Sequence, residues 1–556
     1  MPAISIKLWD IERLVRESIT LNEFKDVINN LKIEFEGIEG DEVYIEVSHD
    51  RADLFSAEGL GRALRYWLGI DEFRGLNVGL SKEVHLIIDN PPRYRPYVLM
   101  SIVRGAKLDD ESIRQLFQLQ EKLHLTYCDE RRLVSIGLYD LDKLKPPVIY
   151  KAVQEFTFRP LDEARQMSLA EILELTEKGV MYKHLVKKGE YPILIDSTNT
   201  VLSFPPIINS EDTRVTENTR NIIIDVTGTE LDLMTKVLTL ITFSVFERTY
   251  GHGSIEIVPI IKGGDLHVEL IKAMNPRELT LRNNDVYELL GIRLSISDVV
   301  NSLKRLGYAI KHVGDGEVKI LIPPFRIDVI GKVDVIEDVA IGYGYDKIAT
   351  ESYPPVHYGE ISKIERFSDI IRELMLGLGF DEVVNFMLID EDFMKSLSTD
   401  SFIVLKNPKL KTYSAIRNSL IPSLLISIKR NSDTFPRMKI FEIGDCVIIE
   451  KGRAVSKRRL GFAIYGNKVT LTDGLTTVKS LMNALGLKYN LRGTRIKGFI
   501  EGRVAEVLVE SHPVGFVGEL HPEVIVKLGL SKPLVLAEID LGELLDLVIR
   551  STTSTT

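Results

Sequence analysis

The chain has 556 residues, a formal net charge of −10, a hydrophobic fraction of 44% and a charged fraction of 27%, values that are typical of a globular protein with several domains. This acidity argues against binding nucleic acid over the whole surface, although it leaves room for a local basic patch. Two distant cysteines, Cys128 and Cys446, exclude a disulfide framework and a cysteine zinc site, and they favour a reducing, cytoplasmic location. The sequence has neither a signal-peptide pattern nor an apolar run long enough for a membrane span, so we expect no membrane role.

Residues 1–85 are expected to form a first unit of helices and a hairpin. A helix should begin after Thr20, because Glu23 three residues later completes a typical capping box. Alternating apolar and polar side chains on both sides of Gly40-Asp41 predict a β-hairpin.

Residues 86–265 are expected to form a larger unit in which strand-like and helical runs alternate. Prolines and small polar residues predict a loop over Ser203–Ser210, and loops of this kind often carry functional groups. The run Ile222–Val226 predicts a buried strand.

The second half of the chain contains two further units. In residues 266–348, two short amphipathic helices precede a hairpin that turns at 314–316, an arrangement like a winged helix. That fold alone does not establish DNA binding. In residues 355–548, an amphipathic helix over Ile361–Leu376 precedes many short strands and helices, which predicts a large antiparallel sheet with helices packed on it.

The stretch Pro324–Lys347 carries a group of carboxylates. Asp334, Glu337 and Asp338 stand at positions i, i+3 and i+4 and therefore share one helix face, while Asp328 precedes them in extended chain. Crowded carboxylates repel one another unless a cation lies between them, and Mg²⁺ prefers oxygen ligands, so this stretch is a candidate metal site. The alternative is a solvated acidic face whose apolar neighbours are buried.

The other motifs and reactive side chains of the sequence indicate no specific function. The sequence has no P-loop, dinucleotide-binding or zinc-protease motif, and its histidines are scattered. We expect Cys128 to be buried and inert. Basic residues in Lys406–Arg417 could contact phosphates, with a solvated loop as the alternative.

Several segments occur together in one order: HDRADLFSAEGLGRAL, RRLVSIGLYDLDKLKPPVIYKAV, VLSFPPIINS followed by IDVTGT, NPRELTLRNNDVYELLGI, PPFRIDVIGKVDVIEDVAIGYGYDKI, IRNSLIPSLLISIKRN, KIFEIGD and VGFVGELHPEVIVKLGL. With these segments the chain resembles, over nearly its whole length, the β subunits of phenylalanyl-tRNA synthetase of the archaeal and eukaryotic type. In contrast to bacterial members of that family, we expect no inserted OB-fold in the first unit and no anticodon-binding domain after about residue 548.

The resemblance implies an α+β multidomain fold and an assembly. Residues 1–85 would be a B1-like N-terminal domain, 86–265 a B3/B4-type editing domain, 266–348 a B5-like domain, and 355–548 a class II synthetase-like sheet that lacks the catalytic motifs and binds the α subunit. The implied enzyme is an α₂β₂ heterotetramer that joins phenylalanine to tRNA(Phe) with ATP. ATP and phenylalanine would be bound by α.

The resemblance further implies a magnesium site. Carried over by position, its ligands are Asp328, Asp334, Glu337 and Asp338. Because the ATP site would lie in the other chain, we expect this Mg²⁺ to support the structure or the subunit interface.

The resemblance also implies an editing site that hydrolyses tRNA mischarged with tyrosine. Tyrosine is phenylalanine with one added hydroxyl, and a hydrophobic pocket cannot strongly reject that group, so a second, hydrolytic site is needed. We expect it to use a positioned water and the tRNA terminus rather than a nucleophilic side chain. The alternative for these residues is that they only cap loops and strands. The candidates are Leu194, Leu202, Ser203, Asn209, Asp225 and Thr227.

Two other functions stay open from the sequence. The first is a non-enzymatic winged-helix scaffold that binds nucleic acid, which would require salt-sensitive binding by residues 266–347. The second is a free-standing hydrolase of mischarged tRNA, which would work without an α subunit.

Overall fold

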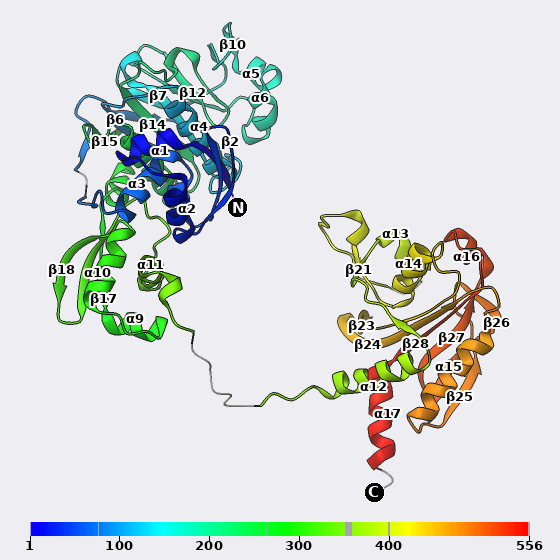
Figure 1. The fold of residues 1–556 in the computed structure, drawn as a ribbon. Coiled ribbons are helices and arrows are strands. Elements are labelled where there is room, and N and C mark those ends of the chain that lie inside the picture. Colours follow the sequence, from blue (N-terminus) through cyan, green and yellow to red (C-terminus); the bar gives the residue numbers. More distant parts are fainter. Residues whose placement is uncertain (1, 76, 263, 351–357, 398–400, 554–556) are drawn as a thin grey trace. The chain divides into compact units, whose positions relative to one another are not determined.

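The structure is a computed structural model that describes residues 2–75, 77–262, 264–350, 358–397 and 401–553. Contacts divide the chain into two compact units, Met1–Ser352 and Tyr353–Thr556 (Figure 1). The predicted start of the last domain, at residue 355, lies outside the described residues. No helix within the described ranges is both long and apolar enough to cross a membrane.

The first unit begins with a three-stranded antiparallel sheet in the order β1-β3-β2. The predicted hairpin at Gly40-Asp41 and the predicted capping box are both confirmed, since Thr20 Oγ1 accepts a hydrogen bond from the Glu23 amide at 3.3 Å. The elements are β1 (Ala3–Lys7), α1 (Leu8–Val15), α2 (Leu21–Asn30), β2 (Ile33–Glu39), β3 (Glu42–Val47) and α3 (Ala57–Trp67).

Two larger sheets follow in the same unit. The five-stranded sheet has the order β4-β15-β6-β14-β7, with β4 (Val78–Leu80), β15 (Ser254–Ile257), β6 (Tyr97–Arg104), β14 (Asn221–Gly228) and β7 (Val134–Asp140). The six-stranded sheet has the order β13-β12-β11-β8-β5-β16, with β13 (Ile208–Asn209), β12 (Val201–Phe204), β11 (Tyr191–Ile195), β8 (Val148–Val153), β5 (Leu86–Asp89) and β16 (Ile260–Lys262).

Successive side chains of a strand face opposite sides of its sheet, and helices pack against these sides. In β6, Ser101 faces α7 (Leu231–Glu247), and its hydroxyl lies 2.7 Å from that of Thr242. Apolar residues of β11 and β12 pack instead in a second core with α5 (Leu169–Leu175) and α6 (Glu177–Tyr182). The helix α4 (Asp110–Leu125) packs beside β7.

The last part of the first unit has the predicted winged-helix-like arrangement. A three-stranded sheet in the order β17-β19-β18 follows the helix α8 and packs with α9, α10 and α11, and α10 lies against α11. Its core is continuous with that of the preceding parts. The elements are α8 (His267–Ala273), β17 (Arg277–Arg282), α9 (Asn283–Leu290), α10 (Ile296–Arg305), β18 (Ala309–Gly314), β19 (Glu317–Ile322) and α11 (Lys332–Tyr343).

The second unit is built on a seven-stranded sheet in the order β20-β23-β24-β28-β27-β26-β25, antiparallel except between β20 and β23. This confirms the predicted large antiparallel sheet. The strands are β20 (Asp381–Glu382), β23 (Met438–Glu450), β24 (Arg453–Tyr465), β25 (Tyr489–Gly493), β26 (Phe499–Val509), β27 (His512–Leu520) and β28 (Leu534–Asp540).

Helices pack on both faces of this sheet. Along β28, Val535, Ala537 and Ile539 belong to one core and Leu534 and Leu536 to the other, as the two-residue period of a strand requires. One face carries α12 (Lys363–Gly377), α15 (Leu471–Ala484) and α17 (Leu541–Thr553), and the other carries α13 (Glu391–Leu397), α14 (Ile421–Asn431) and α16 (Pro522–Lys527). A two-stranded ribbon of β21 (Leu388–Ile389) and β22 (Ala415–Ile416) completes the unit.

Candidate functional site

A cavity of about 110 Å³ is lined by residues of both large sheets in the first unit. Strands β7 and β14 contribute from the five-stranded sheet, and β12 and β13 contribute from the six-stranded sheet, while α4 and α6 complete the wall. The apolar part of the lining includes Phe117, Leu161, Phe204 and Ile207. The polar side chains are Gln120, Glu121, Arg131, Ser135, Tyr139, Lys178, Ser203, Asn209 and Asp225.

Three side chains at this cavity form one hydrogen-bonded group. The hydroxyl of Tyr139 donates to Asp225 Oδ1 at 2.5 Å, and it lies 2.8 Å from Ser203 Oγ. Tyr139 and Asp225 come from neighbouring strands of one sheet, whereas Ser203 comes from the other sheet. All three are buried. The group therefore presents a carboxyl and two hydroxyls to a cavity lined by both polar and apolar side chains.

The carboxyl of Asp225 has an unusual acidity. Burial raises its pKa to about 7, against the opposing effects of the Tyr139 hydrogen bond and of the positive charge on Arg95. Arg95 is itself buried and donates to Thr227 Oγ1 at 2.8 Å and to the Thr227 carbonyl at 2.7 Å. A carboxyl with this pKa can accept or donate a hydrogen bond near neutral pH.

Gly137 keeps the space beside this carboxyl open. It pairs with Asp225 across β7 and β14. A β-carbon at position 137 would lie 1.9 Å from the Tyr139 hydroxyl oxygen and 2.3 Å from Asp225 Oδ1. Any side chain there would therefore displace the hydrogen-bonded pair.

An ion pair shapes another part of the wall. Arg131 Nη2 lies 2.7 Å from Glu121 Oε1, and Arg131 Nη1 donates to the carbonyls of Pro206 and Ile207 at 3.3 and 3.0 Å. Although burial acts to raise it, the hydrogen bond to His124 and the charge of Arg131 lower the pKa of Glu121 to about 2. The ionised Glu121 thus fixes Arg131, which in turn fixes the loop after β12.

The structure brings three of the six predicted editing residues to the cavity, namely Ser203, Asn209 and Asp225. Leu194 and Leu202 lie in the large core of the first unit and do not line the cavity. Thr227 also lies off the wall, where its hydroxyl accepts from Arg95 and lies 2.9 Å from that of Ser135.

Sequence reasoning missed Tyr139 and Gly137. Both lie in a run that predicts only a buried strand, although a glycine inside a strand is a known signal for close approach of another group. The predicted loop Ser203–Ser210 was partly wrong, because Ser203 and Phe204 belong to β12. Their pairing with β11 and β13 places the Ser203 hydroxyl in the wall of the cavity.

The predicted magnesium ligands have other partners in this structure. Arg326, which is buried, lies between Asp328 and Asp338, with Nη2 at 2.7 and 2.6 Å from their Oδ2 atoms. The hydroxyl of Tyr308 also donates to Asp338 at 2.5 Å. Burial raises the pKa of Asp338, whereas in Asp328 the charge of Arg326 outweighs burial and lowers the pKa.

The other two predicted ligands point to different groups. Asp334 accepts from the amides of Ile330 and Gly331 at 2.7 and 2.8 Å and so caps the first turn of α11, while Glu337 forms an ion pair with Lys32. As arranged here, the four carboxylates do not form a magnesium centre. The assignment therefore stays a prediction.

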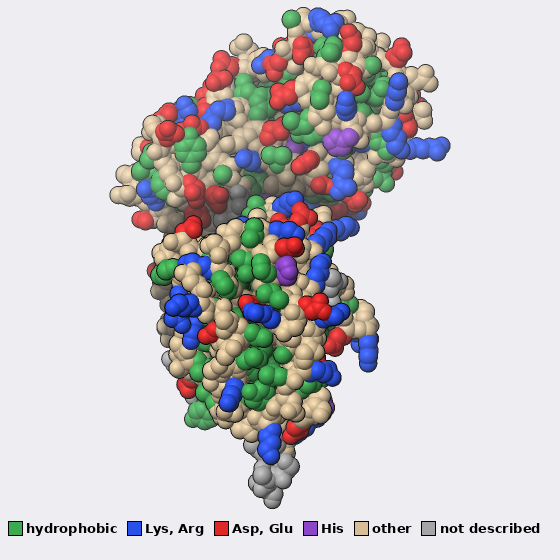
Figure 2. All heavy atoms as spheres, turned by 90° about the vertical axis from the view of Figure 1, so that its right-hand side faces the viewer, with side chains coloured by type: hydrophobic (Ala, Val, Ile, Leu, Met, Phe, Trp, Pro, Cys, Tyr) green, Lys and Arg blue, Asp and Glu red, His purple; other side chains and the backbone are tan. Residues whose placement is uncertain are grey.

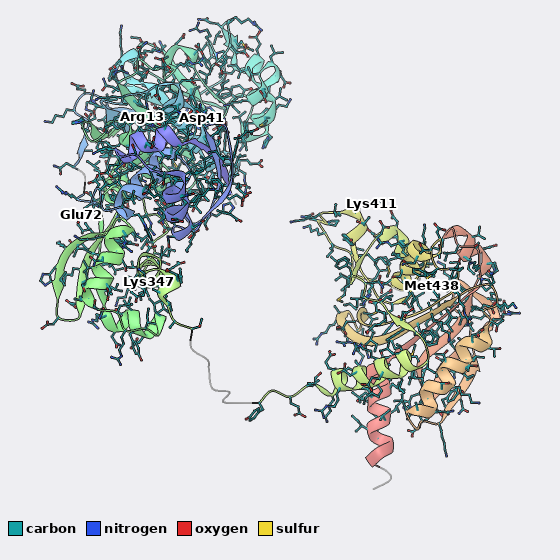
Figure 3. All side chains as sticks on the ribbon, in the orientation of Figure 1. Arg13, Asp41, Glu72, Lys347, Lys411 and Met438 are labelled. Atoms are coloured by element: carbon teal, nitrogen blue, oxygen red, sulfur yellow. The ribbon has the colours of Figure 1, made fainter. Side chains whose placement is uncertain are left out.

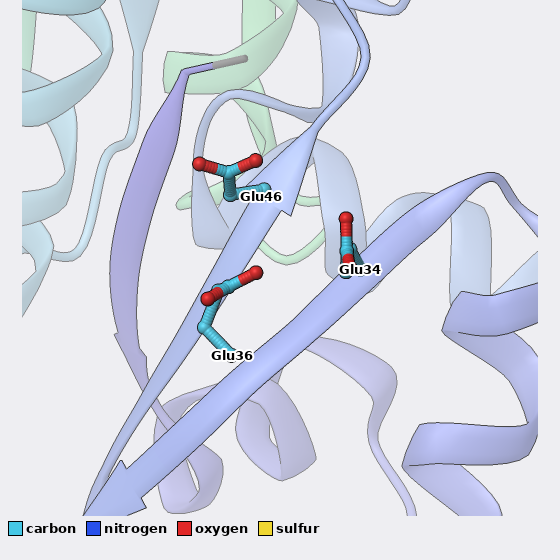
Figure 4. A group of neighbouring side chains, drawn as sticks. All are labelled: Glu34, Glu36 and Glu46. Carbon is cyan, nitrogen blue, oxygen red and sulfur yellow. The ribbon is translucent and has the colours of Figure 1, made fainter. Parts of the chain in front are cut away.

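A different group of acids comes together within the described part of the chain. Single oxygens of Glu34, Glu36 and Glu46 lie within 4.8 Å of one another on β2 and β3 (Figure 4). Glu34 and Glu36 are exposed, and surface acids of this kind commonly face only solvent.

Comparison with known proteins links these features to one family. Phenylalanyl tRNA synthetase beta chain CLM domains match residues 350–541, tRNA synthetase B5 domains match 279–345, and B3/4 domains match 95–240. A phenylalanine--tRNA ligase beta subunit from Thermofilum pendens is 41% identical over 551 residues, which are 97% of each chain. The chain belongs to the family of phenylalanine–tRNA ligase beta subunits.

Two further comparisons support the assignment to the phenylalanine–tRNA ligase beta-subunit family. The Methanocaldococcus jannaschii protein is 35% identical over 97% of this chain and 100% of its own. The crystal structure of an N-terminal fragment of the phenylalanyl-tRNA synthetase beta subunit from Pyrococcus horikoshii is 36% identical, with a TM-score of 0.56, and covers 62% of this chain and all of the fragment. The cavity around Asp225 lies within the B3/4 match, and Asp328 to Asp338 lie within the B5 match.

Proposed function

We propose that this beta subunit acts with an α subunit as an α₂β₂ phenylalanine–tRNA ligase, which charges tRNA(Phe) with phenylalanine at the expense of ATP in the cytoplasm. In this proposal α binds ATP and phenylalanine. The family assignment supports it, because relatives over the full chain are named as one subunit of that ligase. It also favours the ligase over a non-enzymatic scaffold.

We assign α-subunit binding to the C-terminal unit. Between β20 and β22 this unit exposes large apolar side chains, with Val384 90% and Phe386 75% exposed and the Phe386 ring 5.7 Å from that of Tyr413. Figure 2 shows hydrophobic side chains also gathering on one face of this unit. Exposed apolar groups of this size favour a protein interface.

We further propose that the cavity around Asp225 hydrolyses tRNA(Phe) mischarged with tyrosine. The observation that carries this is the buried Asp225 carboxyl, with the Ser203 and Tyr139 hydroxyls, at a cavity whose wall also contains aromatic and aliphatic side chains. A phenylalanine side chain would leave the carboxyl without a new partner, whereas a tyrosine hydroxyl would hydrogen-bond with it. A polar group placed in this way discriminates strongly between ligands with and without the hydroxyl.

The hydrolytic step itself would use water. Cys128 is buried, and burial raises its pKa to about 12, so its thiolate is not available as a nucleophile. His124 is buried, and burial lowers its pKa to about 4, while its Nε2 accepts from the Ile136 amide at 3.0 Å. In our proposal the cavity orients the aminoacyl ester, and a water positioned with the tRNA terminus attacks its carbonyl.

We propose that a Mg²⁺ bound by Asp328, Asp334, Glu337 and Asp338 would have a structural role. The ligand type suits Mg²⁺, but the four groups hold Arg326, two backbone amides and Lys32 in this structure. Mg²⁺ would have to compete with these partners. Binding would therefore affect the packing of α11 and not the chemistry at Asp225.

The ligase proposal is tested by ATP–pyrophosphate exchange with phenylalanine, using this chain alone, α alone and both together. We expect exchange to depend on α and tRNA charging to need both subunits, with a native mass of two copies of each. Exchange by the beta chain alone would contradict the proposal. Because the whole cavity lies in the first unit, a free-standing hydrolase is the second candidate, and full Tyr-tRNA hydrolysis without α would favour it.

A further inference from the structure

A group of basic side chains surrounds the loop that joins α14 to β23 in the C-terminal unit. Lys429 and Arg430 lie in the last turn of α14, and Arg437 and Lys439 follow the loop. Two more come from distant parts of the sequence. Lys532 Nζ donates to the Pro436 carbonyl at 3.0 Å, and Lys468 follows Gly466, where an added β-carbon would lie 3.2 Å from Arg437 Cγ.

These six cations, which we call the 429–532 basic patch, lack acidic partners. Within the described residues, none of their nitrogens lies within 4.0 Å of a carboxylate oxygen, although most arginines elsewhere in the unit are paired. Asp433 lies on the loop itself, Asp381 lines the hollow beside the patch, and Glu382 is held by Arg372 at 2.9 Å. In a chain with a net charge of −10, this is a local excess of positive charge.

The patch borders a hollow with an exposed aromatic ring. A cavity of about 520 Å³ is lined by Asn431, Phe435, Arg437, Met438 and Lys439, among others, and Figure 3 labels Met438 at the start of β23. Phe435 is 54% exposed, although its amide donates to the Asn431 carbonyl at 2.9 Å and so fixes the loop. The ring is thus presented to solvent on an ordered loop beside several cations.

We propose that the 429–532 basic patch binds the phosphate backbone of tRNA, with an unpaired base stacked on Phe435. Unpaired lysines and arginines around a groove are what a polyanion requires, because each neutralised phosphate releases counterions. An exposed aromatic ring beside them provides the stacking surface that single-stranded RNA uses. This inference rests on the proposed function, which makes tRNA the substrate.

The spacing of the cations favours a polymer over a small anion. They come from four separate places: the end of α14, the start of β23, the loop after β24 and the segment before β28. A single phosphate would be surrounded by convergent donors, whereas here Lys439 Nζ donates to the Leu378 carbonyl at 3.3 Å and Lys532 to that of Pro436. Charges distributed in this way follow a backbone that carries one negative charge per nucleotide.

The test measures tRNA(Phe) binding by the assembled enzyme as a function of salt. The patch variant carries Arg430→Ala, Arg437→Ala and Lys468→Ala, and a matched control carries Arg453→Ala, Lys479→Ala and Lys488→Ala, which removes the same charge from exposed residues outside the patch. A third variant, Phe435→Ala, tests stacking alone. The native mass of each complex is measured alongside.

We expect the patch variant to raise the Kd for tRNA about tenfold or more and to reduce the slope of log K against log salt by about 2, while the control changes neither. Phe435→Ala should raise the Kd with the slope unchanged. A patch variant that equals the control would overturn the inference. Loss of subunit assembly would also overturn it, because the patch would then bind protein.

A last arm uses inorganic phosphate as the competitor. If phosphate at millimolar concentration displaces tRNA from the wild type and not from the patch variant at equal ionic strength, the patch is a small-anion site and the inference fails. A wild-type complex that neither charges nor binds tRNA(Phe) would instead refute the proposed function. The two failures are therefore distinguishable.

Discussion

The Tyr139 hydroxyl donates a hydrogen bond to Asp225 Oδ1 at 2.5 Å across two neighbouring strands, and both groups are buried. The protein thus already holds a phenol against this carboxyl. A tyrosine substrate would offer a second phenol to the same group, while phenylalanine would offer none. Under the proposed editing function, the cavity would distinguish the two amino acids by the one hydroxyl in which they differ.

Gly137→Ala should abolish hydrolysis of Tyr-tRNA(Phe) and lower stability. The new methyl group would lie within 2.3 Å of both the Tyr139 hydroxyl and Asp225 Oδ1, so the pair must separate or the strands must shift. We expect a cost of about 1–3 kcal/mol in the free energy of unfolding, measured by denaturant titration. The control is Gly331→Ala, where no atom lies within 4 Å of the added carbon. Equal hydrolysis by both variants would show that the cavity is not used.

Asp225→Asn should change how stability depends on pH. The folded-state pKa of about 7 lies above the value of about 3.9 in an unfolded chain, so between these values the folded state keeps a proton that the unfolded state releases. The stability that this proton contributes is fully present below about pH 4 and is lost as the pH rises through about 7. The loss amounts to about 4 kcal/mol at most in the free energy of unfolding. Asparagine does not titrate. The wild type should therefore lose more stability than Asp225→Asn between pH 4 and pH 8, as measured by thermal unfolding, and parallel curves would contradict the raised pKa.

Arg248→Met should strongly destabilise the first unit. Arg248 is fully buried and donates to Asp10 Oδ1 at 2.8 Å and to Glu58 Oε1 at 2.6 Å, which joins the end of α7 to α1 and α3. Its removal leaves the buried Glu58 carboxylate without a cation and leaves Asp10 with Arg13 alone, at a cost of about 3–5 kcal/mol. The control is Arg104→Met, whose partner Glu256 is partly exposed, and we expect that change to cost about 1 kcal/mol or less. Similar melting points for the two variants would contradict the predicted difference in their loss of stability.

Removal of Mg²⁺ tests the acidic stretch. If Glu337 and Asp334 help to bind the ion, Mg²⁺ at about 100 times its Kd should stabilise the wild type by about 2.7 kcal/mol. Asp334→Asn with Glu337→Gln should remove that gain, while asparagine still offers an oxygen to cap α11. A wild type that melts equally in Mg²⁺ and in chelator would show that these acids serve only Lys32 and the helix cap.

Local patterns in the sequence predicted local structure well. The capping box at Thr20 and the hairpin at Gly40-Asp41 depend on residues only a few positions apart, and the structure contains both of them. The many short strand-like runs in residues 355–548 also predicted the large antiparallel sheet of the C-terminal unit.

The candidate site could be predicted only in part, because it depends on how two sheets pack together. The end of a strand indicated Asp225 and a loop indicated Ser203, but their common partner, Tyr139, lies 86 and 64 residues away from them, respectively. Similarly, no spacing in the acidic stretch indicates that Arg326 would lie between Asp328 and Asp338 or that Lys32 would reach Glu337. Except for that between Arg326 and Asp328, these contacts join segments that are separated in the sequence, and neither helical nor strand periodicity specifies them.

The most direct test of this account is single-turnover hydrolysis of Tyr-tRNA(Phe) by the assembled enzyme. We compare the wild type, Asp225→Ala and Asp196→Ala, the last being a buried carboxylate outside the cavity. Asp225→Ala should slow hydrolysis about 10²-fold or more while charging with phenylalanine continues, and Asp196→Ala should hydrolyse at close to the wild-type rate. Unchanged hydrolysis in Asp225→Ala would contradict the assignment of this cavity to editing.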